Sequence, residues 1–285
     1  VLAGALIWAL AVDAAAADPL TQRLAELGPA RERLLSRFAA VGAPYPPRAV
    51  VLAAFKQERR LEVHARSGSG PWRTIAAFPI LGLGRVEGPK LRKGDRRTPE
   101  GVYRVTHLNP HSRFHLSLLL DYPNRADRAW AAADGRTDLG GDIVIHGGAA
   151  SIGCVAVGND AVEELFVLAA AVGVAGVETI IAPWDFRVRP PVQDAGDTTN
   201  AWVGRRYAEI AKRLAALPSR AAAASSGLGA GPAAVRLAAL ATSPADYRAV
   251  KTDVAARQAA LNRAYRAARD DFRRAAEGGG DALRH

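Results

Sequence analysis

The single cysteine of the 285-residue chain, Cys154, follows a histidine, His146, by eight residues. Small residues dominate the segment between them, which reads Gly-Gly-Ala-Ala-Ser-Ile-Gly. A free thiol is only a few per cent thiolate at neutral pH, but a histidine within hydrogen-bond reach can take its proton and stabilise the thiolate. We therefore expect Cys154 to act as a nucleophile and His146 as its base.

The residues between the pair suggest how a reaction intermediate is stabilised. Gly147, Gly148 and Gly153 allow a tight backbone path and leave main-chain N–H groups unshielded, as an oxyanion site requires. Ser151 is expected either to orient the imidazole or to donate a hydrogen bond to the oxyanion. The alternative is a buried, inert Cys154, because a lone cysteine is commonly a core residue. Spacing alone does not separate the two interpretations.

Short strands surround this segment and place His146 at a strand end. The expected strands are 49–56, 60–65, 74–79, 101–108, 114–120, 142–146 and 178–183. A helix is expected from a capping box at Asp160 and Glu163 to Val172, with Gly173 as its stop. Many short strands around one central helix predict an α+β, β-rich domain over residues 46–190.

The N-terminal residues divide into two expected segments. Residues 1–17 combine a short apolar run with an alanine-rich end, which is typical of a secretory signal peptide; a buried helix is the alternative. Residues 18–45 are expected to hold one amphipathic helix over 19–41, ended by the prolines at 44, 46 and 47. No internal stretch is long and apolar enough to cross a bilayer.

Residues 191–285 are expected to form a basic helical extension. Apolar residues from Val203 to Leu217 recur in steps of three and four, an Ala/Ser/Gly/Pro-rich linker covers residues 218–233, and a second arginine-rich helix follows. Residues 200–285 carry 15 basic and 7 acidic groups, or +8 of the chain's net charge of +10. The two helices are expected to pack against each other or against the core.

The Cys154 segment resembles the signature of the L,D-transpeptidase catalytic domain, in which a His-Gly pair is followed by Ser-x-Gly-Cys. The match extends upstream to residues 88–103, which resemble the family's K-x-G-D-x-R-T-P-E-G-x-Y stretch. Residues 109–117 and 121–124 resemble the segment between the two motifs in one branch of the family. The resemblance covers roughly residues 49–184.

This resemblance implies a fold, a location and a substrate. The fold would be β-rich and sandwich-like, the location the periplasm or cell envelope, and the substrates peptidoglycan stem peptides. By carry-over, Cys154 is the nucleophile, His146 the base, Ser151 a supporting residue and Gly153 part of the oxyanion site. The commonest motif has arginine two positions after the cysteine, where this chain has Ala156, as in a branch that includes an enzyme releasing a wall-linked lipoprotein.

Other candidate residues are weaker. Arg113 and His115 lie in an expected strand and are predicted to border the substrate cleft together with Gly147 and Gly148. His107, His111 and His115 have the spacing of helical metal ligands, but Asn109-Pro110 breaks a helix there, so no metal or other cofactor is expected. Residues 92–97 form a basic cluster that would either grip stem-peptide carboxylates or remain a solvated turn.

Three function classes remain open. The first is a cysteine acyltransferase that acts on stem peptides through a Cys154 thioester, or a related hydrolase that trims stem peptides or releases a wall-linked lipoprotein. The second is a non-catalytic envelope-binding module whose basic tail contacts anionic surfaces. Nucleic-acid binding is disfavoured because the chain begins like an exported protein.

Overall fold

The computed structural model describes residues 18–86, 88–191 and 201–219. Its helices are α1 (Pro19–Glu26), α2 (Gly28–Ala40), α3 (Arg125–Ala133), α4 (Asn159–Val172) and α5 (Ala201–Ala215), with a short 3-10 helix η1 (Val174–Gly176). Its strands are β1 (Ala49–Phe55), β2 (Arg60–Arg66), β3 (Arg73–Pro79), β4 (Gly101–Asn109), β5 (Ser117–Leu120), β6 (Val144–His146), β7 (Val155–Ala156) and β8 (Val177–Ala182). The α+β, β-rich class predicted from the sequence is confirmed.

The strands form one curled sheet in the order β3-β2-β1-β8-β4-β5-β6-β7. The pairs β1–β8 and β6–β7 are parallel, and the other neighbours are antiparallel. Gly82, which follows β3, pairs with Ala156 of β7. The chain leaving the first strand of the sheet therefore meets its last strand, and this closure places the residues before Cys154 against Gly82.

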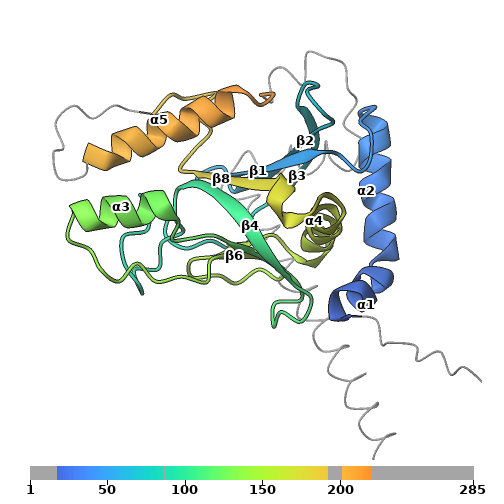
Figure 1. The fold of residues 1–285 in the computed structure, drawn as a ribbon, viewed down its shortest axis with the longest axis horizontal. Coiled ribbons are helices and arrows are strands. Elements are labelled where there is room, and N and C mark those ends of the chain that lie inside the picture. Colours follow the sequence, from blue (N-terminus) through green and yellow to red (C-terminus); the bar gives the residue numbers. More distant parts are fainter. Residues whose placement is uncertain (1–17, 87, 192–200, 220–285) are drawn as a thin grey trace, which may run out of the picture.

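Helices cover both faces of the sheet. In Figure 1, α5 lies on one side of the sheet and α2 and α4 lie on the other. The alternation of side chains along β1 explains why this strand is apolar throughout: Val50, Leu52 and Ala54 join the core with α2 and α4, whereas Val51 and Phe55 join the core with α5.

The N-terminal segment contains two helices where the sequence predicts one. α1 ends at Glu26, and α2 begins at Gly28 with Pro29 in its first turn. Proline has no N–H with which to continue the hydrogen bonds of α1, so the chain starts a new helix there. Residues 30, 34 and 38 of α2 are buried against the core.

Other differences also concern the ends of elements. The strand expected over 114–120 begins only at Ser117, so Arg113 and His115 precede it, and His115 has a φ of +78°. The strand expected over 142–146 begins at Val144, after Asp142 with a φ of +56°. Both φ values lie in the left-handed region, which does not continue a strand.

The capping box of the structure lies on a different helix from the one that the sequence predicts. α4 has Gly158 as its N-cap, with no side-chain cap, so the box expected at Asp160 and Glu163 is absent. Instead, Asn124 and Asp127 form a capping box at the start of α3, a helix that the sequence analysis did not predict.

The first helix of the basic extension is present as α5. Trp202, Arg206, Ile210 and Leu214 are buried in the structure, and α5 packs on β4 and β8 of the core. The expected signal peptide, most of the linker and the second helix lie outside the described residues. No helix among the described residues is long and apolar enough to span a membrane.

Candidate active site

Parallel pairing of β6 and β7 places the two candidate residues on neighbouring strands. His146 ends β6 and pairs with Ala156, and Cys154 immediately precedes β7. Extending that register by two residues places Cys154 beside Val144, two positions along β6 from His146. The backbone N–H of Val144 donates to the Cys154 sulfur, which agrees with this placement.

The imidazole of His146 is buried and has a defined tautomer. Its Nδ1 lies 2.6 Å from the carbonyl oxygen of Gly147, and the residue is 1% exposed. A carbonyl only accepts, so Nδ1 carries the proton and Nε2 of the neutral ring is an acceptor. Burial lowers the pKa of His146, although the bond to Gly147 opposes this shift. The ring is therefore neutral and suited to accept a proton at Nε2.

The thiol of Cys154 is half-buried and protonated at neutral pH. Burial raises its pKa and the charge of Asp142 adds to this effect, whereas the Val144 N–H and the charge of Lys90 oppose it. The thiol donates to the carbonyl oxygen of Asp142, with 3.6 Å between sulfur and oxygen. No hydrogen bond joins the thiol to His146 in the described part of the chain, so this state holds a neutral pair rather than the expected ion pair.

Ser151 supports the backbone of the nucleophile rather than the imidazole. Its hydroxyl donates to the carbonyl oxygen of Cys154 at 2.8 Å and accepts from the N–H of Gly153 at 3.2 Å. These two bonds close the turn that leads into Cys154. In this arrangement the Ser151 hydroxyl does not orient the His146 imidazole, which is one of the two roles that the sequence predicts for it.

The glycine N–H groups of the turn are largely occupied. Gly147 donates to the carbonyl oxygen of Leu116 at 3.2 Å, and Gly148 donates to Oδ1 of Asn159 at 2.9 Å. Gly147 and Gly148 thus have structural partners. The backbone N–H of Cys154 itself has no hydrogen-bond partner among the described residues, which leaves it available to an oxyanion.

Phe114 lies against His146, between Arg113 and His115, the two residues expected to border the cleft. Its ring lies 4.5 Å from the His146 ring, centroid to centroid, and is 37% exposed. The Arg113 guanidinium lies over the Phe114 ring at 5.1 Å. Both ring nitrogens of His115 are engaged within the chain, by Arg23 and Glu163.

Two further residues of the site were missed by the sequence analysis. Asn159, at the first position of α4, accepts a hydrogen bond from the N–H of Gly148. The available sequence signal was an asparagine directly after a glycine at the start of a helix. Ile152 is 77% exposed beside Cys154, and an apolar residue in a small-residue turn was its only signal. Together with Phe114, Ile152 gives the site two exposed apolar side chains.

The basic segment over residues 90–97 packs against the nucleophile turn. A Cβ built on Gly153 would lie 3.6 Å from the carbonyl oxygen of Arg97. Lys90 forms an ion pair with Asp95 at 2.8 Å, which orders the segment. Arg92, Lys93 and Arg96 are exposed.

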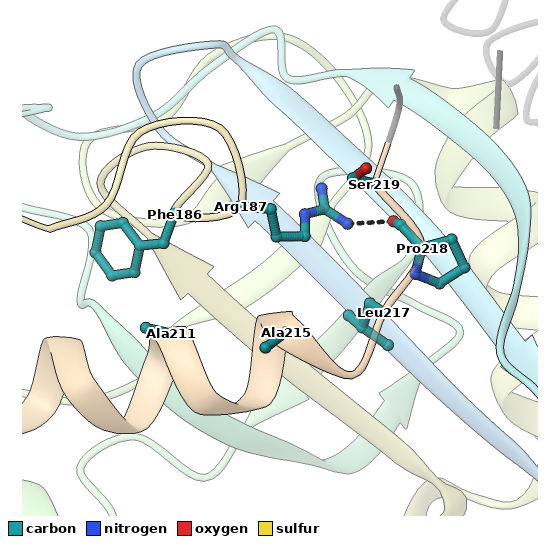
Figure 2. Close-up of a pocket in the computed structure, with 7 residues that line it drawn as sticks. All are labelled: Phe186, Arg187, Ala211, Ala215, Leu217, Pro218 and Ser219. Carbon is teal, nitrogen blue, oxygen red and sulfur yellow. Dashed lines mark hydrogen bonds between the residues drawn. The ribbon is translucent and has the colours of Figure 1, made fainter. Parts of the chain in front are cut away.

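No group of three or more His, Cys, Asp or Glu side chains suited to a metal ion occurs in residues 18–86, 88–191 and 201–219. A pocket of about 410 Å³ lies elsewhere, between the end of α5 and the loop after β8. In Figure 2, Arg187 points toward the carbonyl oxygen of Pro218 at the edge of this pocket. None of its lining residues is a candidate site residue, and Ser219 is the last residue described before the C-terminal segment.

Comparison with known proteins gives a family match in the same region. The L,D-transpeptidase catalytic domain family matches residues 50–181. Escherichia coli K12 YafK, named as a candidate L,D-transpeptidase, is 34% identical over 119 residues, which are 41% of this chain and 46% of YafK. The chain thus spans about half the length of this curated relative.

Solved structures show weaker likeness. The helical cell shape determining protein Pgp2 of Campylobacter jejuni is 23% identical, with a TM-score of 0.39 over 57% of this chain and 54% of Pgp2. L,D-transpeptidase 1 of Mycobacterium tuberculosis is 12% identical, with a TM-score of 0.27 over 47% of this chain and 61% of the other. Matches at these scores carry no argument about activity.

Proposed function

We propose that the chain, whose residues 50–181 match the L,D-transpeptidase catalytic-domain family, is a peptidoglycan-modifying cysteine acyltransferase. Its substrates would be stem peptides, and its covalent intermediate a thioester on Cys154. The observation that supports the proposal is the parallel pairing of β6 and β7, which puts Cys154 next to Val144 in register, two positions from His146, whose Nδ1 is bonded to the Gly147 carbonyl oxygen.

The first chemical step follows from the protonation states of the pair. The Cys154 side chain turns from the Asp142 carbonyl toward His146, whose Nε2 takes the thiol proton as sulfur attacks a carbonyl carbon at the L-centre of the stem peptide. The oxygen gains negative charge and accepts a hydrogen bond from the Cys154 N–H. Collapse of this intermediate breaks the C–N bond, and His146 returns the proton to the leaving amine.

The second step resolves the thioester. An amine from another stem peptide, or water, gives its proton to His146 and attacks the thioester carbon, and sulfur leaves to recover the thiol. An amine acceptor gives a cross-link, whereas water gives a trimmed peptide. Hydrolysis, including release of a wall-linked lipoprotein, is the second candidate function.

One observation favours keeping hydrolysis as that second candidate. Ala156 is fully buried, and its backbone N–H and carbonyl oxygen both pair with Gly82. Because Ala156 is buried, position 156 offers no open space for a long cationic side chain. The role of the arginine in the commonest family motif is therefore not filled at this position. This removes one candidate anchor for an acyl acceptor.

The location proposed for this activity is the periplasm or cell envelope, where peptidoglycan is found. A contact between the basic C-terminal extension and an anionic envelope surface is part of the same proposal. Most of that extension lies outside the described residues, so its charge is the only support for the contact.

Product analysis tests the function directly. Purified protein is incubated with tetrapeptide muropeptides, and the products are separated by liquid chromatography with mass detection. Cross-linked dimers identify a transferase and free tripeptides a hydrolase. Cys154→Ser is expected to lower either product by at least about a thousandfold. Equal product from both proteins would exclude Cys154 as the nucleophile.

The non-catalytic envelope-binding module makes the opposite prediction. It expects no product with either protein, and binding of the wild type and of Cys154→Ser to purified sacculi with the same affinity. The protonated thiol of the free protein suits either function, so product formation rather than thiol reactivity separates the two.

A further inference from the structure

We infer that Phe114 is a positioning residue for His146 and that a clamp formed by Arg23, His115 and Glu163 holds it in place. This inference rests on the proposed role of His146 as the base. It links the site to α1, which lies outside the family match over residues 50–181.

The contact between the two rings is the first observation. Phe114 covers the His146 ring at 4.5 Å with an interplanar angle of 35°. His146 is 1% exposed although its ring lies at the candidate active site, whereas Phe114 is 37% exposed. Phe114 thus stands between the imidazole and solvent, and it limits the ring to an orientation that keeps Nδ1 on the Gly147 carbonyl.

The backbone around Phe114 is tightly fixed. The N–H of Phe114 donates to the Ser112 hydroxyl at 3.2 Å, and its carbonyl oxygen accepts from Leu116 at 3.1 Å. The same carbonyl would lie only 2.6 Å from a Cβ at Gly147. The Phe114 segment and the His146 segment therefore cannot move independently.

His115 turns the chain directly after Phe114. Its φ of +78° is unfavourable for a residue with a side chain. Its side chain is held from two helices: Nε2 lies 2.8 Å from Oε1 of Glu163 on α4, and Nδ1 lies 3.3 Å from Nη2 of Arg23 on α1. These contacts offset the cost of the turn.

The hydrogen-bonding groups of the clamp are complementary. Arg23 only donates and the Glu163 carboxylate only accepts, so the tautomer with its proton on Nε2 bonds to both neighbours. Burial raises the pKa of Glu163, but the hydrogen bonds from His115 and Arg33 and the charge of Arg33 outweigh it, so the pKa is lowered. Arg33 of α2 lies 3.2 Å from Oε2 of the same carboxylate, which ties the clamp to both N-terminal helices.

Two matched pairs of variants test the inference. Phe114→Leu removes the ring and keeps an apolar side chain, whereas Phe114→Tyr keeps the ring. Arg23→Gln weakens the clamp, whereas Arg31→Gln changes an exposed arginine of α2. The readouts are the NMR titration of the His146 ring, kcat/KM on muropeptides and the thermal midpoint.

The expected effects on the His146 titration and on kcat/KM decrease from Phe114→Leu to Arg23→Gln. Phe114→Leu exposes the imidazole, so the His146 titration moves to higher pH, and kcat/KM falls about tenfold because the base is misplaced. Arg23→Gln gives changes of the same sign and smaller size. Phe114→Tyr keeps the His146 titration of the wild type, and Arg31→Gln matches the wild type in all three readouts.

The groups facing His146 also bear on this titration. They are the Cys154 thiol from the turn before β7 and the Arg113 guanidinium over Phe114, and neither is changed in these variants. An unchanged His146 titration in both Phe114→Leu and Arg23→Gln would overturn the inference. If Phe114→Leu does not fold, the surface variant Arg23→Gln decides. If the wild type does not turn over muropeptides, the proposed function fails, yet the titration still tests the clamp.

Discussion

Two regions of the molecule use polar residues in different ways. Under α5, charged side chains are buried and form ion pairs: Arg206 binds Asp127 at 2.6 Å, and Arg187 binds Glu62 and Asp185 at 2.8 and 2.7 Å. At the end of β6, the Cys154 thiol and the His146 imidazole are neutral, and the thiol donates to the carbonyl oxygen of Asp142 rather than to the imidazole. The buried ion pairs hold α5 against the core, whereas no bond among the described residues fixes the thiol and the imidazole to each other.

The largest effect is expected where a buried pair loses one partner. Arg206→Leu leaves the Asp127 carboxylate buried without its cation, which should lower the free energy of unfolding by about 3–5 kcal/mol. Arg205→Leu, one position away and exposed, should change it by less than about 0.5 kcal/mol. Chemical denaturation measures both. Equal stabilities would mean that the buried pair does not hold α5 to the core.

The free energy of unfolding should depend on pH in the acid range because of Glu62. Burial would raise the pKa of Glu62, but the hydrogen bond from His64 and the charges of Arg187 and Arg60 lower it from 4.5 to about 2. A lowered pKa contributes stability above pH 4.5, and that contribution is lost as the pH falls from 4.5 through 2. The shift of about 2.5 units corresponds to about 3 kcal/mol.

Denaturant unfolding at several pH values checks this response. Glu62→Gln should be less stable than the wild type at pH 7, and the difference should shrink as the pH approaches 2. A constant difference over that range would show that the Glu62 carboxylate is not the titrating group.

A smaller loss is expected where the two segments of the site touch. Gly147→Ala would bring its Cβ within 2.6 Å of the Phe114 carbonyl oxygen and 2.7 Å of Oδ1 of Asn159. The backbone must shift, at a cost of about 1–3 kcal/mol, and turnover should fall because His146 moves with it. Gly141→Ala, which meets nothing within 4 Å, is the control. Equal turnover for the two variants would contradict the tight packing of the site.

The smallest effect concerns the thiol itself. The rate of alkylation by iodoacetamide should rise with a midpoint above that of an ordinary cysteine, because burial raises the pKa of Cys154. Asp142→Asn removes a charge that also raises it, so its midpoint should be lower than that of the wild type. A wild-type midpoint near or below pH 7 would show that the free protein holds a thiolate–imidazolium pair.

Local signals explain what the sequence analysis predicted well. His146 and Cys154 are joined by a short glycine-containing turn, so their proximity depends on eight residues and on one strand pair. The strands and α4 follow from runs of apolar residues. Such features are encoded within a few residues and need no knowledge of distant contacts.

Non-local contacts explain what it missed. Arg23 and His115 are 92 residues apart in the chain and meet only after α1 packs beside the sheet. The position of the Phe114 ring on His146 depends on the left-handed backbone of His115. A glycine would have signalled this turn in the sequence, but the residue there is a histidine. α4 has Gly158 as its N-cap because of the path that the backbone takes out of β7. This path overrides the preference of Asp160 for an N-cap position.

Intact-protein mass spectrometry during incubation with tetrapeptide muropeptides tests the central claim most directly. The wild type is expected to gain the mass of the acyl portion of one stem peptide, without the amine that leaves, and hydroxylamine should remove this group as it does from a thioester. Cys154→Ala should gain nothing. An adduct on the variant, or none on the wild type while products accumulate, would contradict catalysis through Cys154.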